Sequence, residues 1–249
     1  MKTAIRLLAG IAGALLVAGC QTTANAPERG RHLQWSGYRW AVKNEPQPVG
    51  PGPNPFSGKR EDVFVDAQGQ LHLNIVKRAD HWMSTEIASF GSLGYGTYTF
   101  EVAGGATDTP GNAVLGLFTY DIEPADQHRE IDIELSRWND GRRENIQCAL
   151  QPAELPHLVH RVPLVENPSG WTMSFRWSPG IVDCLITARP SVAGATPQVV
   201  TSHRFTRGVP RPGNEKVRLN FWLFRGGAPD TNKPAEVVIR SFAFSPLPE

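Results

Sequence analysis

Glu130-Ile131-Asp132-Ile133-Glu134 alternates three carboxylates with two β-branched isoleucines. Because successive side chains of an extended strand point to opposite faces, this alternation predicts a β-strand with the acids on one face and the isoleucines on the other. Like charges this close raise one another's pKa values, a cost that folding avoids unless the cluster has a use. The stretch therefore predicts a strand that carries a catalytic site. A solvated acidic face paired with Lys and Arg is the alternative.

On both sides of this stretch, short strand-like segments follow one another, each bounded by Gly, Pro, Asn or Asp. Segments 63–65 and 71–76 flank Asp66-Ala67-Gln68-Gly69, which predicts a hairpin. The proline- and glycine-rich segment 46–55 is expected to be an irregular loop. The remaining expected strands are 95–102, 113–120, 130–135, 145–150, 171–177, 181–188, 217–224 and 236–244.

No segment has a convincing amphipathic helix pattern, and there is no internal repeat. Many short strands without helical crossovers predict an all-β, antiparallel domain. A single small barrel is possible, but a two-sheet jelly-roll sandwich fits the length of 249 residues better. One all-β domain is therefore the expected architecture.

The composition is that of a globular domain with a sizeable core. Hydrophobic residues make up 40% of the chain, and 24 Gly and 21 Pro provide many turns. The 25 Lys and Arg nearly balance the 24 Asp and Glu, which gives a formal net charge of +1. This balance gives no electrostatic reason to expect nucleic acid as a partner. A monomer is expected.

The N-terminus is typical of a targeting segment. Lys2 and Arg6 precede a short apolar run, 7–18, which is too short to span a bilayer as a helix. The run ends in Leu16-Val17-Ala18-Gly19-Cys20, which resembles a bacterial lipobox. The resemblance implies a signal peptide over residues 1–19 and lipidation of Cys20; a secretory signal with an incidental cysteine is the alternative.

A lipidated Cys20 implies a protein anchored in the bacterial cell envelope. Gln21, rather than Asp, follows the cysteine and resembles an outer-membrane address, on the periplasmic or the surface side. Residues 20–32 are expected to form a flexible tether, and 33–249 the folded domain. Two further cysteines, Cys148 and Cys184, either form one disulfide in this exported chain or remain separately buried thiols.

Three acids on one strand face suit the hydrolysis of a glycosidic bond. That reaction uses two carboxyl groups, one to donate a proton and one to attack the sugar or activate water. In a strand, the Cα atoms of Glu130 and Glu134 are roughly 13 Å apart, so only a concave sheet brings the two carboxyl groups together. Asp132, between them, can share a proton with one glutamate and keep the pKa of the other high.

The same five residues resemble the signature of glycoside hydrolase family 16, which includes β-glucanases, agarases, carrageenases and xyloglucan transglycosylases. The resemblance covers roughly residues 60–248 and implies a jelly-roll sandwich with a sugar cleft on its concave face. The agreeing segments, in order, are 89–98 (SFGSLGYGTY), 112–120 (NAVLGLFTY), 175–180 (FRWSPG) and 219–222 (LNFW).

The family resemblance assigns a role to each acid. Glu130 would be the nucleophile and Glu134 the general acid/base, with Asp132 assisting. The implied enzyme is a retaining glycosidase that acts on a β-linked, glucan-like polysaccharide by double displacement. A transglycosylase with the same site, or a non-catalytic carbohydrate-binding envelope lipoprotein on the same fold, are the alternatives.

Sugar rings stack on aromatic faces, so a glycan cleft is expected to contain aromatic side chains. Trp138 and Trp222 are the best candidates, and their alternative is ordinary core packing. The other candidate substrate-binding residues are Asn220, Phe118 and Tyr120, followed by Trp82 and Tyr95. The histidines and cysteines lack metal-ligand spacing, so neither a metal nor a cofactor is expected.

The chain departs from the family pattern around the motif. His128 and Arg129 precede it, where the family often has Trp and an acidic residue. Arg129 either lowers the pKa of Glu130 or, as its parity suggests, points to the opposite face. Ala149 and Leu150 stand where lichenases carry Asn and Tyr, and the conventional Arg or Lys near Glu86 is absent. The expected chemistry is therefore more specific than the expected substrate.

Overall fold

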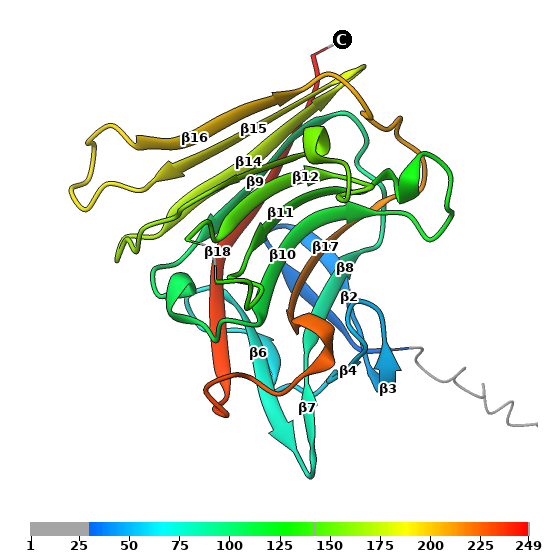
Figure 1. Cartoon of the computed structure of the whole chain (residues 1–249), viewed down its shortest axis with the longest axis vertical. Helices are drawn as coiled ribbons and strands as arrows, with labels where there is room; N and C mark the ends of the chain where they lie inside the picture. Colours follow the sequence, from blue (N-terminus) through cyan, green and yellow to red (C-terminus); the bar gives the residue numbers. More distant parts are fainter. Residues whose placement is uncertain (1–29, 142, 249) are drawn as a thin grey trace, which may run out of the picture.

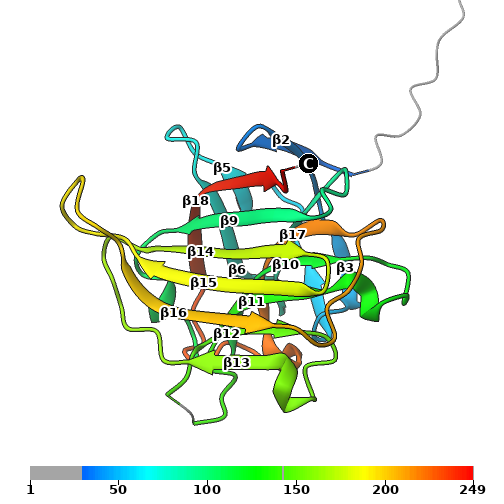
Figure 2. The same cartoon turned by 90° about the horizontal axis from the view of Figure 1, so that it is seen from above.

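The computed structural model describes residues 30–141 and 143–248, which form two large antiparallel sheets packed face to face (Figures 1 and 2). The first, here called the front sheet, has the strand order β1 (His32–Trp35), β2 (Tyr38–Val42), β8 (Thr85–Ser89), β17 (Lys216–Leu223), β10 (Ala113–Tyr120), β11 (Ile131–Leu135), β12 (Ile146–Leu150) and β13 (Val159–Val162).

The second, here called the back sheet, has the order β16 (Gln198–Phe205), β15 (Ile181–Ala188), β14 (Trp171–Ser178), β9 (Gly96–Val102), β18 (Ala235–Pro246), β6 (Leu71–Arg78) and β5 (Val63–Val65), with β7 (His81–Met83) paired to β6. A separate two-stranded ribbon joins β3 (Glu45–Val49) and β4 (Asn54–Phe56). The only helical elements in the described part of the chain are four short 3-10 turns, at Ala106–Asp108, Gln127–Arg129, Pro156–Leu158 and Phe224–Gly226. The prediction of an all-β jelly-roll sandwich is confirmed.

The core lies between the two sheets because each strand alternates its side chains. In β11, Ile131, Ile133 and Leu135 face the back sheet and are almost fully buried. Across the core, Trp171 and Trp177 of β14 are fully buried. Burying one such apolar side chain contributes about 1.5–3 kcal/mol. The opposite face of β11 is left free for the carboxylates.

A disulfide between Cys148 and Cys184 links the sheets. The two residues belong to β12 and β15, are 36 residues apart in sequence and have Cα atoms 6.5 Å apart. Of the two alternatives left open by the sequence, the bridge is the one that the structure contains. A bond that closes a loop of this length stabilises a fold by about 3–4 kcal/mol in the chain-entropy model. Since Cys148 pairs in register with Ile133, the bond secures the strand beside the acids.

Most strand predictions are confirmed to within two residues, but segment 46–55 is not wholly irregular. It contributes β3 and the start of β4. Their prolines are tolerated because this ribbon pairs at only two positions, Glu45 with Phe56 and Val49 with Asn54. The strands that the sequence did not predict are β1, β2, β3, β4, β7, β8, β13 and β16. They are short, or polar on the exposed face and at a sheet edge, so their hydrophobic alternation is weak.

The predicted signal peptide, Cys20 and most of the predicted tether lie outside the described residues. Regular structure begins at His32, where β1 starts. Within residues 30–141 and 143–248, no helix is long and apolar enough to cross a membrane.

Candidate active site

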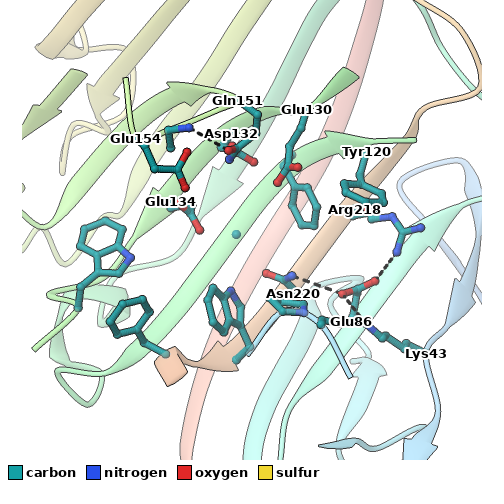
Figure 3. Close-up of a pocket in the computed structure, with 18 residues that line it drawn as sticks. Lys43, Glu86, Tyr120, Glu130, Asp132, Glu134, Gln151, Glu154, Arg218 and Asn220 are labelled. Carbon is teal, nitrogen blue, oxygen red and sulfur yellow. Dashed lines mark hydrogen bonds and ion pairs between the residues drawn. The ribbon is translucent and has the colours of Figure 1, made fainter. Parts of the chain in front are cut away.

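The three acids of the motif lie together on the outer face of the front sheet (Figure 3). Asp132 and Glu134 belong to β11, whereas Glu130 immediately precedes it in an extended conformation (φ −90°, ψ 122°). The strand therefore begins one residue later than predicted, without changing the face that Glu130 presents. Asp132 is only 4% exposed, and the two glutamates are half-buried.

These carboxyl groups line a cleft with a volume of about 700 Å³. Eight of the ten residues predicted for catalysis or sugar binding line it: Glu130, Asp132, Glu134, Trp138, Trp222, Asn220, Phe118 and Tyr120. Trp82 and Tyr95 do not, and Tyr95 packs edge-to-face on Trp177, with ring centroids 5.4 Å apart. The cleft volume is within the usual range for ligand sites.

Strand register arranges the floor of the cleft in transverse rows. One row crosses the sheet from β8 to β13 and contains Glu86, Asn220, Gly116, Glu134, Gln147 and Arg161. Gly116 separates Asn220 from Glu134, and a Cβ there would lie 2.4 Å from Asn220 Oδ1. The glycine thus keeps the middle of the cleft floor low.

Two glutamines on the neighbouring strand and loop hold the acids, and the sequence did not predict either. The Gln147 amide donates to Glu134 Oε2 at 2.5 Å, and the Gln151 amide donates to Asp132 Oδ2 at 3.0 Å. Ala149, which lies opposite Asp132, carries only a methyl group, so the amide that reaches Asp132 comes from Gln151. Gln147 is two residues from Ala149, so the sequence could have placed both side chains on the same face of this strand. The sequence could not have shown that Gln147 donates to Glu134.

Burial raises the pKa of all three carboxyl groups. For Glu130, desolvation and the negative charge of Glu134 raise the pKa to about 7. Desolvation, followed by the charges of Glu130 and Glu134, raises the pKa of Asp132 well above its usual value. The raised pKa of Asp132 favours its protonated form, which donates a hydrogen bond to Glu130.

Desolvation also raises the pKa of Glu134, while the Gln147 hydrogen bond and the Arg161 charge oppose that increase. Because repulsion between Glu130 and Glu134 is mutual, the two titrate as a coupled pair. Below about pH 7 the pair carries at least one proton. One ionised and one protonated carboxyl group are what acid-assisted displacement requires.

A second charged group lies at the other side of the cleft (Figure 3). Glu86, which is 1% exposed, accepts from Arg218 Nη1 at 2.7 Å and from Lys43 Nζ at 3.3 Å. These two cations supply the basic partners that the sequence around Glu86 lacks. Arg218 also stacks over Tyr120, and its charge opposes the increase in the pKa of Glu130.

Arg129 does not have this role, although it adjoins Glu130 in sequence. It lies in the 3-10 turn Gln127–Arg129 rather than in a strand, and its guanidinium group pairs with Asp121 at 3.0 Å. The cation that acts on Glu130 therefore comes from β17, 88 positions further along the chain.

The aromatic candidates differ in how much surface they offer to a sugar. Trp222 and Tyr120 are half-buried, whereas Phe118 and Trp138 are only 8% and 9% exposed. One face of Trp138 is covered by the guanidinium group of Arg161, which lies 4.1 Å from the ring centroid. Asn220 donates to Glu86, while its buried Oδ1 atom has no hydrogen-bond partner among the described residues.

The part of the chain that the structure describes contains no group of three or more His, Cys, Asp or Glu residues placed to hold a metal ion. The chemical groups of the cleft are thus carboxyl, amide, guanidinium, ammonium and aromatic groups.

No protein-family model matches this sequence, and no curated protein sequence matches it. Solved structures do match. A β-glucanase of Bacillus licheniformis superposes with a TM-score of 0.61 at 16% identity, covering 88% of this chain and 99% of that chain. A prokaryotic β-1,3-1,4-glucanase (lichenase) from a mouse hindgut metagenome gives 0.60 at 16% identity, with 84% and 93% covered.

A third similar structure is a Mycobacterium tuberculosis protein described as an immunostimulatory antigen and pseudo β-1,3-glucanase. It has a TM-score of 0.59 at 19% identity and covers 81% of this chain and 88% of that chain. At such identities the likeness concerns the fold, and one fold can carry different activities. This chain has the jelly-roll fold of the glycoside hydrolase family 16 β-glucanases.

Proposed function

We propose that this protein is a retaining glycoside hydrolase that acts on a β-linked, glucan-like polysaccharide. The observation that carries the proposal is the row Glu130, Asp132 and Glu134 on one face of a strand, inside a cleft of about 700 Å³. A structural acidic surface would be solvated and paired with cations. Here Asp132 is buried, and burial raises the pKa of all three carboxyl groups.

In the first step, the Glu130 carboxylate attacks the anomeric carbon while Glu134 donates its proton to the leaving glycosidic oxygen. The bond to the leaving sugar breaks, and an ester forms between the retained sugar and Glu130. In the second step, Glu134 removes a proton from water, whose oxygen displaces Glu130 from the sugar. Two inversions retain the configuration at the anomeric carbon.

The groups around Glu130 and Glu134 support their proposed roles as nucleophile and acid/base. Protonated Asp132 donates to Glu130 and so favours its ionised form, and the positive charge of Arg218 acts in the same direction. Glu134 becomes more acidic when Gln147 donates to it, which makes its proton easier to release. Because the coupled pair keeps the proton that Glu134 must donate only below about pH 7, activity should decrease as the pH rises through about 7.

Substrate recognition is proposed for the cleft residues beyond the acids. Trp222 and Tyr120 offer aromatic faces on which a sugar ring can stack, and Asn220 lines the same cleft. The β-glucan class is suggested by the similar structures, which are described as β-glucanases.

The test combines digestion with covalent trapping. The protein is incubated with a panel of β-linked polysaccharides, and products are identified by mass spectrometry. A 2-fluoro glycosyl fluoride of the best substrate should then label Glu130 in the intact protein. Sugar binding without product release and without labelling would contradict the proposal and identify a non-catalytic binding protein. Longer products than substrates would identify a transglycosylase.

We also propose that the chain is a lipoprotein of the bacterial envelope, on the basis of the lipobox that ends at Cys20. The Cys20→Ser variant should move from the membrane fraction to the soluble fraction, because the sulfur that carries the lipid is removed. Metabolic labelling with a fatty-acid analogue should mark the wild type alone. Equal membrane association of both proteins would contradict the anchor.

A further inference from the structure

Arg161 contacts both Gln147, which donates a hydrogen bond to the proposed acid/base Glu134, and Trp138, which lines the same cleft. It lies on β13 directly opposite Gln147, which in turn lies opposite Glu134 on β11. Its Nε and Nη2 atoms both donate to Gln147 Oε1, at 3.0 and 2.6 Å, and its Nη1 atom donates to Asp140 at 3.2 Å. The flat face of the same guanidinium group covers the Trp138 ring at 4.1 Å.

This fork fixes the orientation of the Gln147 amide. Because a guanidinium group can only donate, the atom of Gln147 that faces Arg161 must be its oxygen. The amide nitrogen then faces Glu134 and donates to it at 2.5 Å. Without Arg161, the Gln147 amide can rotate by half a turn and present its oxygen to Glu134. Arg161 therefore determines whether Glu134 receives a hydrogen bond.

Arg161 also holds the Trp138 ring, which lines the cleft. Trp138 has a left-handed backbone conformation (φ 45°), which is uncommon for a bulky residue, and its amide donates to Ser136 Oγ. The indole is held between this turn and the guanidinium group, and it lines the same cleft as Glu134.

We propose that Arg161 is a positioning residue that couples sugar binding at Trp138 to the placement of Glu134 through Gln147. The proposal rests on the proposed function, since it assigns Glu134 as the acid/base. A sugar that contacts the exposed part of Trp138 in the cleft presses the indole against a guanidinium group that also orients Gln147. The acid/base is thereby held in place when the neighbouring sugar site is filled.

The charged groups that face Glu134 can all be named. Asp132 shares β11 with it and Glu130 immediately precedes that strand, Arg161 acts from β13, and Glu154 lines the cleft from the loop after β12. On the neighbouring strand β10, the residue opposite Glu134 is the uncharged Gly116. Arg161 is the only cation among these groups in the described part of the chain, so its removal should have a direct effect on the titration of Glu134.

The experiment uses the folded protein without its lipid anchor and compares Arg161→Met with Arg189→Met. Arg189 is a suitable control because it is also half-buried in an ion pair, with Glu101 at 2.6 Å, but it does not line the cleft. In 13C-carboxyl NMR titrations, Glu134 should titrate at higher pH in Arg161→Met than in the wild type or the control. The Trp138 indole resonance, assigned with Trp138→Phe, should shift in Arg161→Met alone.

Two further variants separate positioning from general disruption. Gln147→Leu should move the titration of Glu134 but leave the Trp138 resonance near its wild-type position. Arg161→Lys keeps the charge but loses the planar fork, so it should restore less than half of the wild-type activity. In Arg161→Met, kcat should decrease by roughly 10- to 100-fold, with a smaller effect on KM.

Titration and indole spectra of Arg161→Met that match those of Arg189→Met would overturn the proposal. So would a Gln147→Leu variant that disturbs Trp138 as much as Arg161→Met does, because that would indicate a general collapse. Both NMR measurements are made without substrate. If no polysaccharide is cleaved yet the NMR shifts occur, the proposed function fails while the connection between Arg161, Gln147 and Glu134 stands.

Discussion

Glu130→Gln is expected to lower kcat/KM by roughly 10³-fold or more on any polysaccharide that the wild type cleaves. The amide keeps the shape of the side chain, and its oxygen can still accept the hydrogen bond from Asp132. It cannot, however, form the ester intermediate. Initial rates on the best polysaccharide of the panel, with the variant purified free of wild-type enzyme, measure this loss.

The same substitution should stabilise the fold at neutral and higher pH. The pKa of Glu130 is raised from 4.5 to about 7, so its contribution to wild-type stability is highest below about pH 4.5 and is lost as the pH rises through 7. The glutamine side chain of the variant has no charge to desolvate at any pH. With allowance for partial exposure of this position, the variant should gain about 1–2 kcal/mol at pH 8, or a few degrees in Tm, and almost nothing at pH 4.

Glu123→Gln provides the control for both measurements, because Glu123 is exposed and does not line the cleft. It should leave activity and the pH dependence of Tm at their wild-type values. Wild-type turnover in Glu130→Gln would exclude Glu130 as the nucleophile. An equal Tm difference at pH 4 and pH 8 would show that the ionisation of Glu130 is not what destabilises the wild type.

Glu134→Gln is expected to lower kcat/KM on polysaccharide by about 10²- to 10⁴-fold, the usual contribution of a general acid. The reason is that a sugar alcohol is a poor leaving group unless its oxygen is protonated. With an aryl glycoside whose phenolate leaves without a proton, the first step should be nearly as fast as in the wild type. The glycosyl-enzyme should then accumulate, since no base activates water.

Intact-mass spectrometry of Glu134→Gln with such an aryl glycoside should detect the added sugar on Glu130. Azide should accelerate release of the sugar from Glu134→Ala and yield a β-glycosyl azide, because this nucleophile needs no base. Equal losses on polysaccharide and on the activated glycoside would refute the acid/base role. The double variant Glu130→Gln, Glu134→Gln is the blank for background hydrolysis.

The similar structures do not show whether this chain turns over a substrate, so the carboxyl variants are needed to decide it. One of them is described as a pseudo β-1,3-glucanase, so the jelly roll alone does not establish turnover. The present chain combines the fold with three buried or half-buried carboxyl groups on one strand face. Loss of activity in single carboxyl variants, with the fold intact, is the result that would separate an enzyme from a binding protein.

Much of the front sheet could be predicted because its signals are local. Residues 113–120 and 130–135 alternate or are uniformly apolar over enough positions to predict strands, and β10 and β11 follow closely. The edge strand β16 was missed since only Phe205 of its eight residues is buried. The disulfide stayed open in the sequence because pairing depends on the distance between two sheets.

In the candidate active site, too, some features follow from the local sequence and others depend on contacts between distant residues. The face shared by Glu130, Asp132 and Glu134 follows from the two-residue period of a strand, which the sequence alone determines. In sequence, the cation next to Glu130 is Arg129, but the cation whose charge lowers the pKa of Glu130 is Arg218 on β17. Sequence proximity failed there because Arg129 lies in the 3-10 turn Gln127–Arg129 with a left-handed backbone conformation, and its guanidinium group pairs with Asp121.

By itself the sequence determined an all-β chain with one acidic strand and a strongly apolar opposite face, since both are properties of consecutive residues. Only the tertiary structure decided what surrounds the acids. Arg218 meets Glu86 across 132 positions of sequence, and Arg161 reaches Glu134 through Gln147 only because β11, β12 and β13 pair in one register. Register is fixed by how the whole hydrophobic face fits against the back sheet, so no local pattern contains it.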